Sequence, residues 1–291
     1  SSFILFTGRP AGLRCGERED FMLRISQLTL PVEHTPEQLK KKLLRTARIK
    51  ENELKSFAIR KRSLDARKKP ELYYVYTVDF CAENEKRVLR QTKGKVQKVA
   101  EKAYRVPKHG AEPLKNRPVV IGSGPAGLFC AYLLAAEGYS PLIVERGAPV
   151  RERREDVERF WKTGVLNTAS NVQFGEGGAG TFSDGKLNTL VKDPAGRNRY
   201  VLETFVRFGA PEEIVWEQKP HIGTDILISV VESMRREIQR LGGEFSFRSM
   251  VTDILPKENC LVINNEEKIK TDAAVLAIGH SARDTFSMLY D

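Results

Sequence analysis

Residues 118–127 read Pro-Val-Val-Ile-Gly-Ser-Gly-Pro-Ala-Gly, and this stretch decides the fold. Its apolar start predicts a short strand, and the Ala/Leu-rich residues 126–137 predict a helix that ends at Gly138. A second apolar stretch, residues 141–144, completes a strand–helix–strand unit with a parallel sheet. The pattern therefore predicts an α/β protein with a Rossmann-like domain that opens at about residue 117.

The glycines of this turn follow the pattern Gly-x-Gly-x-x-Gly, and each has a physical task. Gly122 allows the tight turn, Gly124 lets the backbone approach a pyrophosphate, and Gly127 lets the helix pack against the strand. The helix N-terminus presents free N–H groups to phosphates, and proline suits its first turn. The predicted dinucleotide-binding loop consists of Gly122, Ser123, Gly124, Pro125, Ala126 and Gly127.

Glu145 ends the second strand, 23 residues after Gly122. An acidic side chain at this point accepts hydrogen bonds from the hydroxyls of an adenosine ribose and disfavours a 2′-phosphate. Arg146 follows it and is included in the predicted site. Glycines and one acid do not distinguish FAD from NAD, so the identity of the dinucleotide stays open at this point.

Two later segments resemble flavoproteins that are built from two dinucleotide folds. Residues 273–279, Ala-Ala-Val-Leu-Ala-Ile-Gly, read as a buried strand that ends in a glycine. They resemble the second fingerprint of that group, in which Ala277 and Gly279 approach the cofactor. Residues 242–251 resemble the strand whose backbone meets the adenine, at about Val251. The resemblance implies that FAD is the bound dinucleotide.

Residues 174–187 read Phe-Gly-Glu-Gly-Gly-Ala-Gly-Thr-Phe-Ser-Asp-Gly-Lys-Leu, and their glycines imply close backbone approach or positive φ angles. The end of this run imitates a phosphate-binding P-loop. However, Leu187 stands where a Ser or Thr is needed for Mg²⁺, and no apolar strand leads into the run. We therefore predict a flavin-facing loop in which Gly178, Gly180 and Lys186 contact the cofactor. A glycine-rich surface loop is the alternative.

Several motifs together resemble the bacterial family of FAD-dependent, NAD(FAD)-utilizing dehydrogenases. These motifs are residues 144–147, 175–187, 221–225, 277–286 and, in the leading domain, 61–70. The resemblance covers residues 22–291 and implies bound FAD and an oxidoreductase, without indicating the substrate. Flavoproteins of the two-dinucleotide type usually close the FAD domain with a further strand and a Gly-Asp motif. Because the sequence stops at Asp291, we expect this domain to be incomplete at its C-terminus.

The N-terminal part predicts a small α+β domain. Residues 23–30 alternate as a half-buried strand with one slip at Ser26 and Gln27, and Thr35 with Pro36 begins a helix. Further strands are predicted at 53–64 and 72–80, and a further helix at 86–91. This order suggests a ferredoxin-like arrangement. The predicted order of domains is a non-native or disordered extension (1–21), the small basic domain (22–91), a linker (92–116) and the FAD-binding domain (117–291) with a substrate-side insertion (about 187–222).

Positive charge is concentrated in the first part of the chain. Residues 1–115 hold 27 Lys/Arg and 14 Asp/Glu, whereas the rest of the chain is nearly neutral. The cations Arg60, Lys61, Arg62, Arg67, Lys68 and Lys69, with Tyr73, Tyr74 and Tyr76 nearby, could contact RNA or another acidic partner. An RNA-binding flavoprotein, with FAD used in tRNA modification or structurally, is therefore the alternative function. A solvated basic surface explains the same charges more simply.

Composition and cysteine spacing exclude other classes. No stretch approaches the ~18 consecutive apolar residues of a membrane helix, and no signal-peptide pattern is present, so we expect a cytoplasmic protein without a membrane partner. The cysteines, Cys15, Cys81, Cys130 and Cys260, are far apart and form no C-x-x-C pair. This argues against a disulfide framework, a zinc ribbon and a dithiol redox site, and no metal site is predicted.

No catalytic residue is assigned, because the sequence identifies no substrate to place beside one. His221 is a candidate general acid or base, and His280 is a candidate loop residue near the cofactor. The Arg/Glu run at residues 151–159 is expected to form a helix with a solvated face. The sequence thus predicts an FAD-dependent oxidoreductase that acts on a small organic substrate, with NAD(P)H as a candidate co-substrate. The flavin would carry the redox chemistry.

Overall fold

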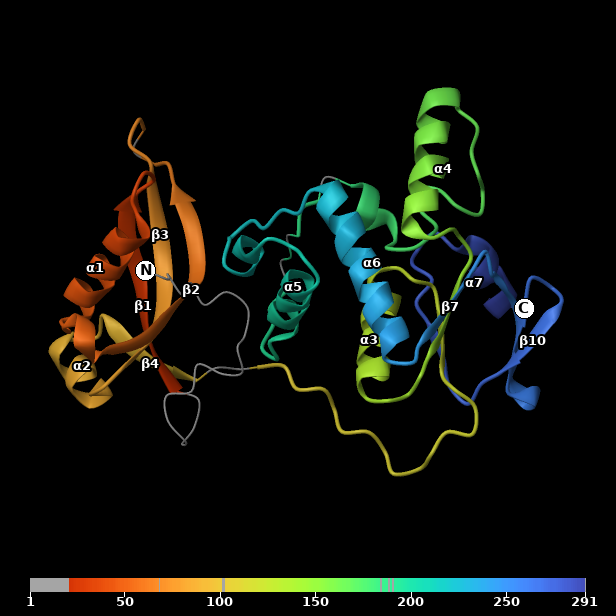
Figure 1. Cartoon of the computed structure of the whole chain (residues 1–291), viewed down its shortest axis with the longest axis horizontal. Coiled ribbons are helices and arrows are strands. Elements are labelled where there is room, and N and C mark those ends of the chain that lie inside the picture. Colours follow the sequence, from red (N-terminus) through yellow and green to blue (C-terminus); the bar gives the residue numbers. More distant parts are fainter. Residues whose placement is uncertain are drawn as a thin grey trace. The chain divides into compact units, whose positions relative to one another are not determined.

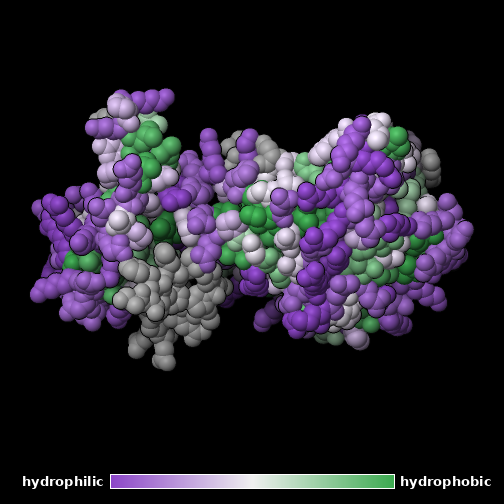
Figure 2. Space-filling view, turned by 45° about the horizontal axis from the view of Figure 1, so that its top comes forward, coloured by the Kyte–Doolittle hydropathy of each residue, from purple (hydrophilic) through white to green (hydrophobic). Residues whose placement is uncertain are grey.

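The computed structural model describes residues 21–67, 69–100, 103–183, 185–187, 189 and 191–290. These residues form two compact units (Figure 1). The first unit comprises residues up to 104 together with 186–221, and the second comprises 105–185 together with residues from 222 onward. On the face shown in Figure 2, hydrophilic residues cover most of both units and hydrophobic residues form smaller patches. The prediction for residues 1–21 falls outside the described residues except at Phe21, where the first strand begins.

The first unit contains a ferredoxin-like sheet with helices on one face. Its elements are β1 (Phe21–Pro31), α1 (Pro36–Ala47), β2 (Leu54–Asp65), β3 (Tyr73–Ala82), α2 (Glu85–Gln91) and β4 (Val96–Ala100). The strands follow the order β2-β3-β1-β4, and every neighbouring pair is antiparallel. This is the split βαβ topology that the sequence suggested.

Local sequence signals explain the start of this unit. Thr35 caps α1, because its side chain accepts a hydrogen bond from the backbone N–H of Gln38 while the Gln38 side chain bonds back to Thr35. The slip in alternation is a β-bulge between Ile25 and Leu28, at which Gln27 takes a φ of 64°. The core under the helices is formed by Leu23, Ile25, Leu43, Val78 and Phe80, among others.

Two predictions for this region are wrong. Residues 96–100 were expected in a linker but form β4, which pairs with β1 from Phe21 to Ile25. Only Val96 of this strand is buried, so its polar residues imitate a linker, as exposed edge strands commonly do. Cys81 is disulfide-bonded, so the argument against disulfides from sequence separation is wrong for this residue. A disulfide depends on distance in space, which separation along the chain does not measure.

The segment 186–221 belongs to the first unit and contacts the outer edge of β2. It contains α5 (Arg197–Arg207) and a short 3₁₀ helix, Glu212–Val215. Arg62 donates its backbone N–H to the carbonyl of Trp216 at 2.7 Å and accepts from the N–H of Gln218 at 3.0 Å. The Arg62 guanidinium also donates to the Glu217 carboxylate at 2.6 Å. The edge strand is therefore covered by this segment.

Ion pairs engage several cations that were predicted to contact RNA. Arg60 lies 3.0 Å from the buried carboxylate of Asp79, Arg62 pairs with Glu217, and Arg67 pairs with Asp65. Tyr76 is buried in the core, so its ring is not open for base stacking. Lys68 lies outside the described residues. These contacts give no support to RNA binding at this stretch, which stays a prediction.

The second unit is built on a parallel sheet of order β11-β5-β6-β7. Its strands and helices are β5 (Val119–Ile121), α3 (Pro125–Ala136), β6 (Leu142–Glu145), α4 (Val150–Thr163), α6 (Thr224–Arg240), β7 (Glu244–Phe247), β8 (Val251–Leu255), β9 (Cys260–Ile263), β10 (Glu267–Lys270), β11 (Ala274–Leu276) and α7 (Arg283–Tyr290). The α/β Rossmann-like prediction is confirmed.

The parallel sheet lies between two layers. Helices α3 and α6 contact each other and the sheet strands on one face. On the other face, Val119 and Ile121 pack with Val251 and Leu261 of the antiparallel sheet β10-β9-β8. One expectation is wrong here, because β11 is an edge strand of the described sheet and Leu276 is 46% exposed. Its continuous apolar sequence is typical of a central strand, and sequence alone does not distinguish the two positions.

Candidate functional site

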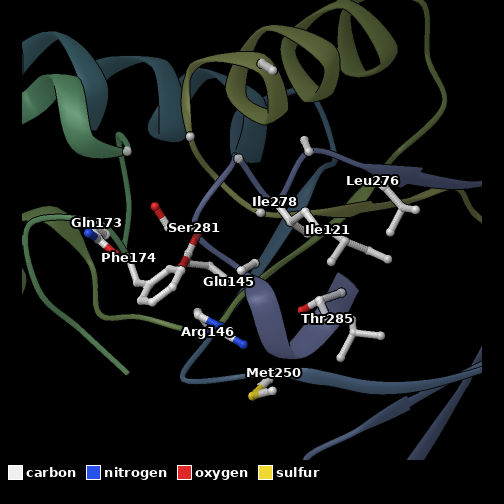
Figure 3. A pocket seen from close by; sticks show the side chains of 18 of the residues that line it. Ile121, Glu145, Arg146, Gln173, Phe174, Met250, Leu276, Ile278, Ser281 and Thr285 are labelled. Carbon is white, nitrogen blue, oxygen red and sulfur yellow. The ribbon is translucent and has the colours of Figure 1, made fainter. Parts of the chain in front are cut away.

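A cavity of about 510 Å³ opens at the carboxyl edge of the parallel sheet (Figure 3). In open α/β sheets, ligands bind at this edge, beyond the ends of the strands. It is lined by residues at the ends of β5, β6 and β11, by α7, and by the glycine-rich loop that runs through Phe174 and Gly178. Its volume is within the range of roughly 300–1,000 Å³ that is usual for small-molecule and cofactor sites.

The turn between β5 and α3 forms the floor of the cavity, and two of its glycines are fixed by packing. Gly122 takes a φ of 99°, and a Cβ there would lie 2.6 Å from the carbonyl oxygen of Ala277. A Cβ on Gly127 would lie 1.8 Å from the carbonyl oxygen of Gly122. A side chain at either position would displace backbone, so both glycines are needed for the fold itself.

Gly124 has a different role, because the protein leaves space around it. It is the N-cap of α3, and no side chain caps that helix end. A Cβ on Gly124 would meet nothing closer than the Cα of Gly178, at 3.8 Å, so the space beside it belongs to the cavity. Gly178 itself takes a φ of 67°, and a Cβ there would lie 2.8 Å from Pro125. The uncapped helix end and these two glycines form a cradle that suits an anionic group.

Glu145 lies at the end of β6 and is 4% exposed. Its Oε2 accepts hydrogen bonds from the backbone N–H and the hydroxyl of Ser123, both at 2.8 Å, and its Oε1 accepts from the N–H of Gly147 at 2.9 Å. These bonds fix the carboxylate against the glycine turn. A carboxylate has about four acceptor positions, so it retains capacity toward the cavity.

The guanidinium of Arg146 stacks on the Phe174 ring at the cavity wall. The guanidinium carbon lies 4.5 Å from the centre of the Phe174 ring, and Arg146 donates to Asp284 of α7 at 2.7 Å. Figure 3 shows Arg146 near Met250 and Thr285. Burial raises the pKa of Asp284, but the hydrogen bonds from Arg146 and from the N–H of Thr285 outweigh it and lower this pKa overall. The pair is therefore ionised at neutral pH.

The glycine-rich loop is held by a fully buried arginine of α4. Arg153 donates to the backbone carbonyl oxygens of Asn171, Val172, Gly175, Glu176 and Gly178 at distances from 2.6 to 3.3 Å. Its guanidinium also lies 4.7 Å from the centre of the Phe182 ring. Burial lowers the pKa of Arg153 to about 10, so it remains charged at neutral pH. Arg153 therefore determines the path of the loop that forms one side of the cradle.

Glu176 lies inside this loop and is fully buried. Its Oε2 accepts from the backbone N–H of Val150 at 2.7 Å and from Arg235 at 2.8 Å. Among the described residues, its Oε1 has no hydrogen-bond partner. Burial raises the pKa of Glu176 to about 7, although Arg235 and the Val150 N–H act in the opposite direction.

Comparison with known proteins identifies the family of the second unit. Residues 116–288 match the family model described as pyridine nucleotide-disulphide oxidoreductase. The chain belongs to this family. It is thus a member of an FAD-binding oxidoreductase family. Residues 22–81 match a separate model, a domain of unknown function, DUF8436.

Individual relatives match the chain over part of their own length. An uncharacterized protein of Clostridium beijerinckii is 45% identical over 271 residues, which are 92% of this chain and 50% of that protein. The chain thus spans about half the length of this relative. Among solved structures, THI4 of Thermovibrio ammonificans is 21% identical, with a TM-score of 0.38, and the match covers 60% of this chain and 61% of that one. Thioredoxin reductase of Lactococcus lactis is 15% identical, with a TM-score of 0.30, covering 56% and 35%.

In this oxidoreductase family member, most of the predicted site residues lie around the cavity at the carboxyl edge of the parallel sheet. Those that line it are Gly122, Gly124, Pro125, Ala126, Glu145, Arg146, Gly178, Val251, Ala277 and Gly279. Ser123 lies behind Glu145, and Gly127 packs against Gly122. Gly180 is exposed and does not line the cavity. Lys186 falls in the first unit, where it forms a β-bridge with His221. His280 lines the cavity.

Sequence reasoning missed three residues of this site. Arg153 was placed on a solvated helix face, and this is wrong because it is fully buried. Its spacing from Val150 and Val157 matches one helix face, a signal that the surrounding charges obscured. Phe174 and Asp284 were missed as partners of Arg146, because no local pattern relates residues so far apart along the chain.

Two other features are absent from the described residues. None of their helices is both long enough and apolar enough to cross a membrane. Among the same residues, no group of His, Cys, Asp and Glu side chains is arranged to hold a metal ion.

Proposed function

We propose that this chain is the FAD-binding part of an oxidoreductase that transfers a hydride or electrons between a small organic substrate and the flavin. NAD(P)H or another acceptor would complete the cycle. The observation that carries the proposal is the cradle at the carboxyl edge of the sheet, where Gly124 and Gly178 leave space beside an uncapped helix N-terminus and Glu145 stands at the end of the next strand.

The residues present fit the adenosine diphosphate half of FAD. The N-terminus of α3 and the Gly124–Gly178 cradle would hold the pyrophosphate. Glu145 would accept hydrogen bonds from the ribose, and the backbone at Val251 would meet the adenine. Ala277 and Gly279, at the end of β11, would face the remaining part of the cofactor. Bound FAD would supply the redox chemistry, and the chain binds and orients it.

Cysteine chemistry is not expected to supply the redox function in residues 116–288. The cysteines of this stretch, Cys130 and Cys260, are both free. Burial raises the pKa of the Cys130 thiol, which disfavours the reactive thiolate. The flavin is therefore the proposed redox group of this part of the protein. The family of NAD(FAD)-utilizing dehydrogenases, which the motifs resemble, is the proposed subgroup.

Mass spectrometry of the ligand released from the purified 291-residue chain, together with its visible absorbance, tests the proposal. We expect a flavin spectrum and the mass of FAD. If the chain is purified without ligand, titration with FAD should quench flavin fluorescence at a stoichiometry of about one. Failure of FAD to bind in either form would contradict the proposal. Bleaching of the bound flavin by NADH tests the nicotinamide link separately.

A further inference from the structure

Charged groups from two segments that are distant along the chain meet beside the cavity. Glu145 ends β6, Arg146 follows it, and Asp284 comes from α7. Glu145 is 4% exposed, and the Arg146 side chain is 14% exposed. The Asp284 side chain is 49% exposed. Arg146 therefore pairs with a half-exposed carboxylate next to the buried Glu145, and this small cluster has a net negative charge.

Contacts on both sides of Arg146 fix its guanidinium. The Phe174 ring lies at 4.5 Å and Asp284 Oδ2 at 2.7 Å. Asp284 is itself anchored, since its Oδ1 accepts from the backbone N–H of Thr285 at 2.8 Å. The stacked and paired guanidinium is thus held in one position, with donors already used by Asp284.

We infer that Asp284, by holding Arg146, makes this site select an adenosine with a free ribose 2′-hydroxyl and reject one with a 2′-phosphate. The inference rests on the proposed function, because it concerns which adenine dinucleotides this same site accepts. Asp284 is a specificity-determining residue that acts through Arg146. It does not touch the ligand itself.

The chemistry of the two ligands explains the selection. In dinucleotide folds, an arginine near the acidic residue accommodates a 2′-phosphate when the arginine is free to pair with it. Here Asp284 already neutralises Arg146, and Glu145 adds a second negative charge. A 2′-phosphate brings about two further negative charges at neutral pH, so like charges would be forced together in a partly buried site. A 2′-hydroxyl instead donates a hydrogen bond to Glu145.

Calorimetric titration with ADP and with adenosine 2′,5′-bisphosphate tests the inference on the 291-residue chain after removal of bound nucleotide. The wild type should bind ADP and bind the bisphosphate at least about tenfold more weakly. Asp284→Asn keeps the shape of the side chain and its contact with Thr285 but removes the charge. In this variant the ratio of bisphosphate to ADP affinity should rise about tenfold, and adding Arg146→Gln should cancel the gain.

Glu258→Gln is the matched control, because it adds the same charge by breaking an exposed pair with Lys268 that does not line the cavity. It should leave the affinity ratio within about twofold. An unchanged ratio in Asp284→Asn with ADP binding intact would overturn the inference and leave the proposed function standing. A wild type that binds the bisphosphate more tightly than ADP would also overturn the inference and leave the proposed function standing. A wild type that binds neither ADP nor FAD would overturn both.

Discussion

The guanidinium of Arg153 donates a hydrogen bond to the backbone carbonyl oxygen of Glu176 at 2.6 Å, joining α4 to the glycine-rich loop. The same guanidinium reaches other carbonyl oxygens of this loop as far as Gly178. An arginine has planar, fixed donors, so it can satisfy several carbonyls at once in a way that a lysine cannot. The Arg153 side chain therefore fixes the loop beside the cradle.

Arg153→Lys should weaken both the fold and the binding of the cofactor. The ammonium group cannot reach the same set of carbonyls, and unpaired carbonyls would remain buried with it. We expect the free energy of unfolding to fall by about 3 kcal/mol and FAD affinity to fall at least about tenfold. Urea denaturation and flavin fluorescence titration measure the two effects.

Arg159→Lys provides the control for Arg153. It lies on the same helix but is 55% exposed and pairs only locally, with Asp156. Its effect on the free energy of unfolding should stay within about 0.5 kcal/mol. Equal effects of the two substitutions would show that Arg153 does not hold the loop.

Gly124→Val and Gly127→Ala should separate binding from folding. The backbone of Gly124 has φ −67° and ψ −178°, which any residue adopts, and a side chain there would extend into the cavity. We expect this variant to remain folded, at a cost of about 1 kcal/mol for the poorer N-cap, and to lose FAD binding. Gly127→Ala should instead cost about 3 kcal/mol, because its Cβ meets the carbonyl oxygen of Gly122.

Circular dichroism and flavin titration of both variants measure the separation. A Gly124→Val protein that retains stoichiometric FAD would show that the cofactor does not occupy the cradle. A Gly127→Ala protein with unchanged stability would show that the turn can relax away from α3.

The sequence was sufficient for the parts of this protein that local patterns determine. The glycine spacing and the acid at Glu145 predicted the βαβ unit, and the Thr35 cap and the slip at Gln27 predicted details of the first sheet. These features depend on backbone conformation and on neighbours a few residues away. These features can therefore be predicted from the sequence before the fold is known.

The features that sequence analysis missed or predicted wrongly depend on partners that are distant along the chain. Arg146 and Asp284 are 138 residues apart, and no composition or period relates them. Arg153 resembled its solvated neighbours because burial of a charge is decided by the loop that covers it. The strand β4 has polar residues on its exposed positions, so its identity depends on the partner strand β1.

Glu176 should make stability fall as pH rises. Its pKa is about 7 in the folded chain, above the ordinary value of 4.5, because burial disfavours the ionised form. The folded chain therefore holds this proton over a pH range in which the unfolded chain has lost it. The stability contributed is fully present below about pH 4.5 and is lost as pH rises through about 7. At ~1.4 kcal/mol per pKa unit, the change is at most about 3 kcal/mol.

Glu176→Gln should remove this dependence, because glutamine keeps an acceptor for the Val150 N–H but does not ionise. The free energy of unfolding, measured by urea denaturation from pH 5 to pH 8, should fall less with pH in the variant than in the wild type. Glu258→Gln, at an exposed site, serves as the control and should follow the wild type. Parallel curves for Glu176→Gln and the wild type would contradict a raised pKa at Glu176.

Arg62 and Glu217 should be energetically coupled, because their ion pair reinforces a backbone contact at the edge of β2. Both side chains are partly buried, at 26% and 28% exposed, so the pair should be worth about 1 kcal/mol, at the upper end for exposed ion pairs. A double-mutant cycle with alanine at both positions measures this coupling, and the charge-swapped pair should recover part of it. Hydrogen exchange at residues 212–218 should rise in each single variant.

The local pair Arg67–Asp65 is the matched comparison for this cycle, since Arg67 is 87% exposed and its partner lies two residues away in the chain. Its coupling energy should be near zero, because a solvated pair within one turn gains little attraction and constrains no distant segment. Equal coupling energies in the two cycles would mean that the Glu217 segment is not held to β2 by its charge. In that case the backbone bonds of Arg62 with Trp216 and Gln218 would be sufficient to hold the segment at the edge.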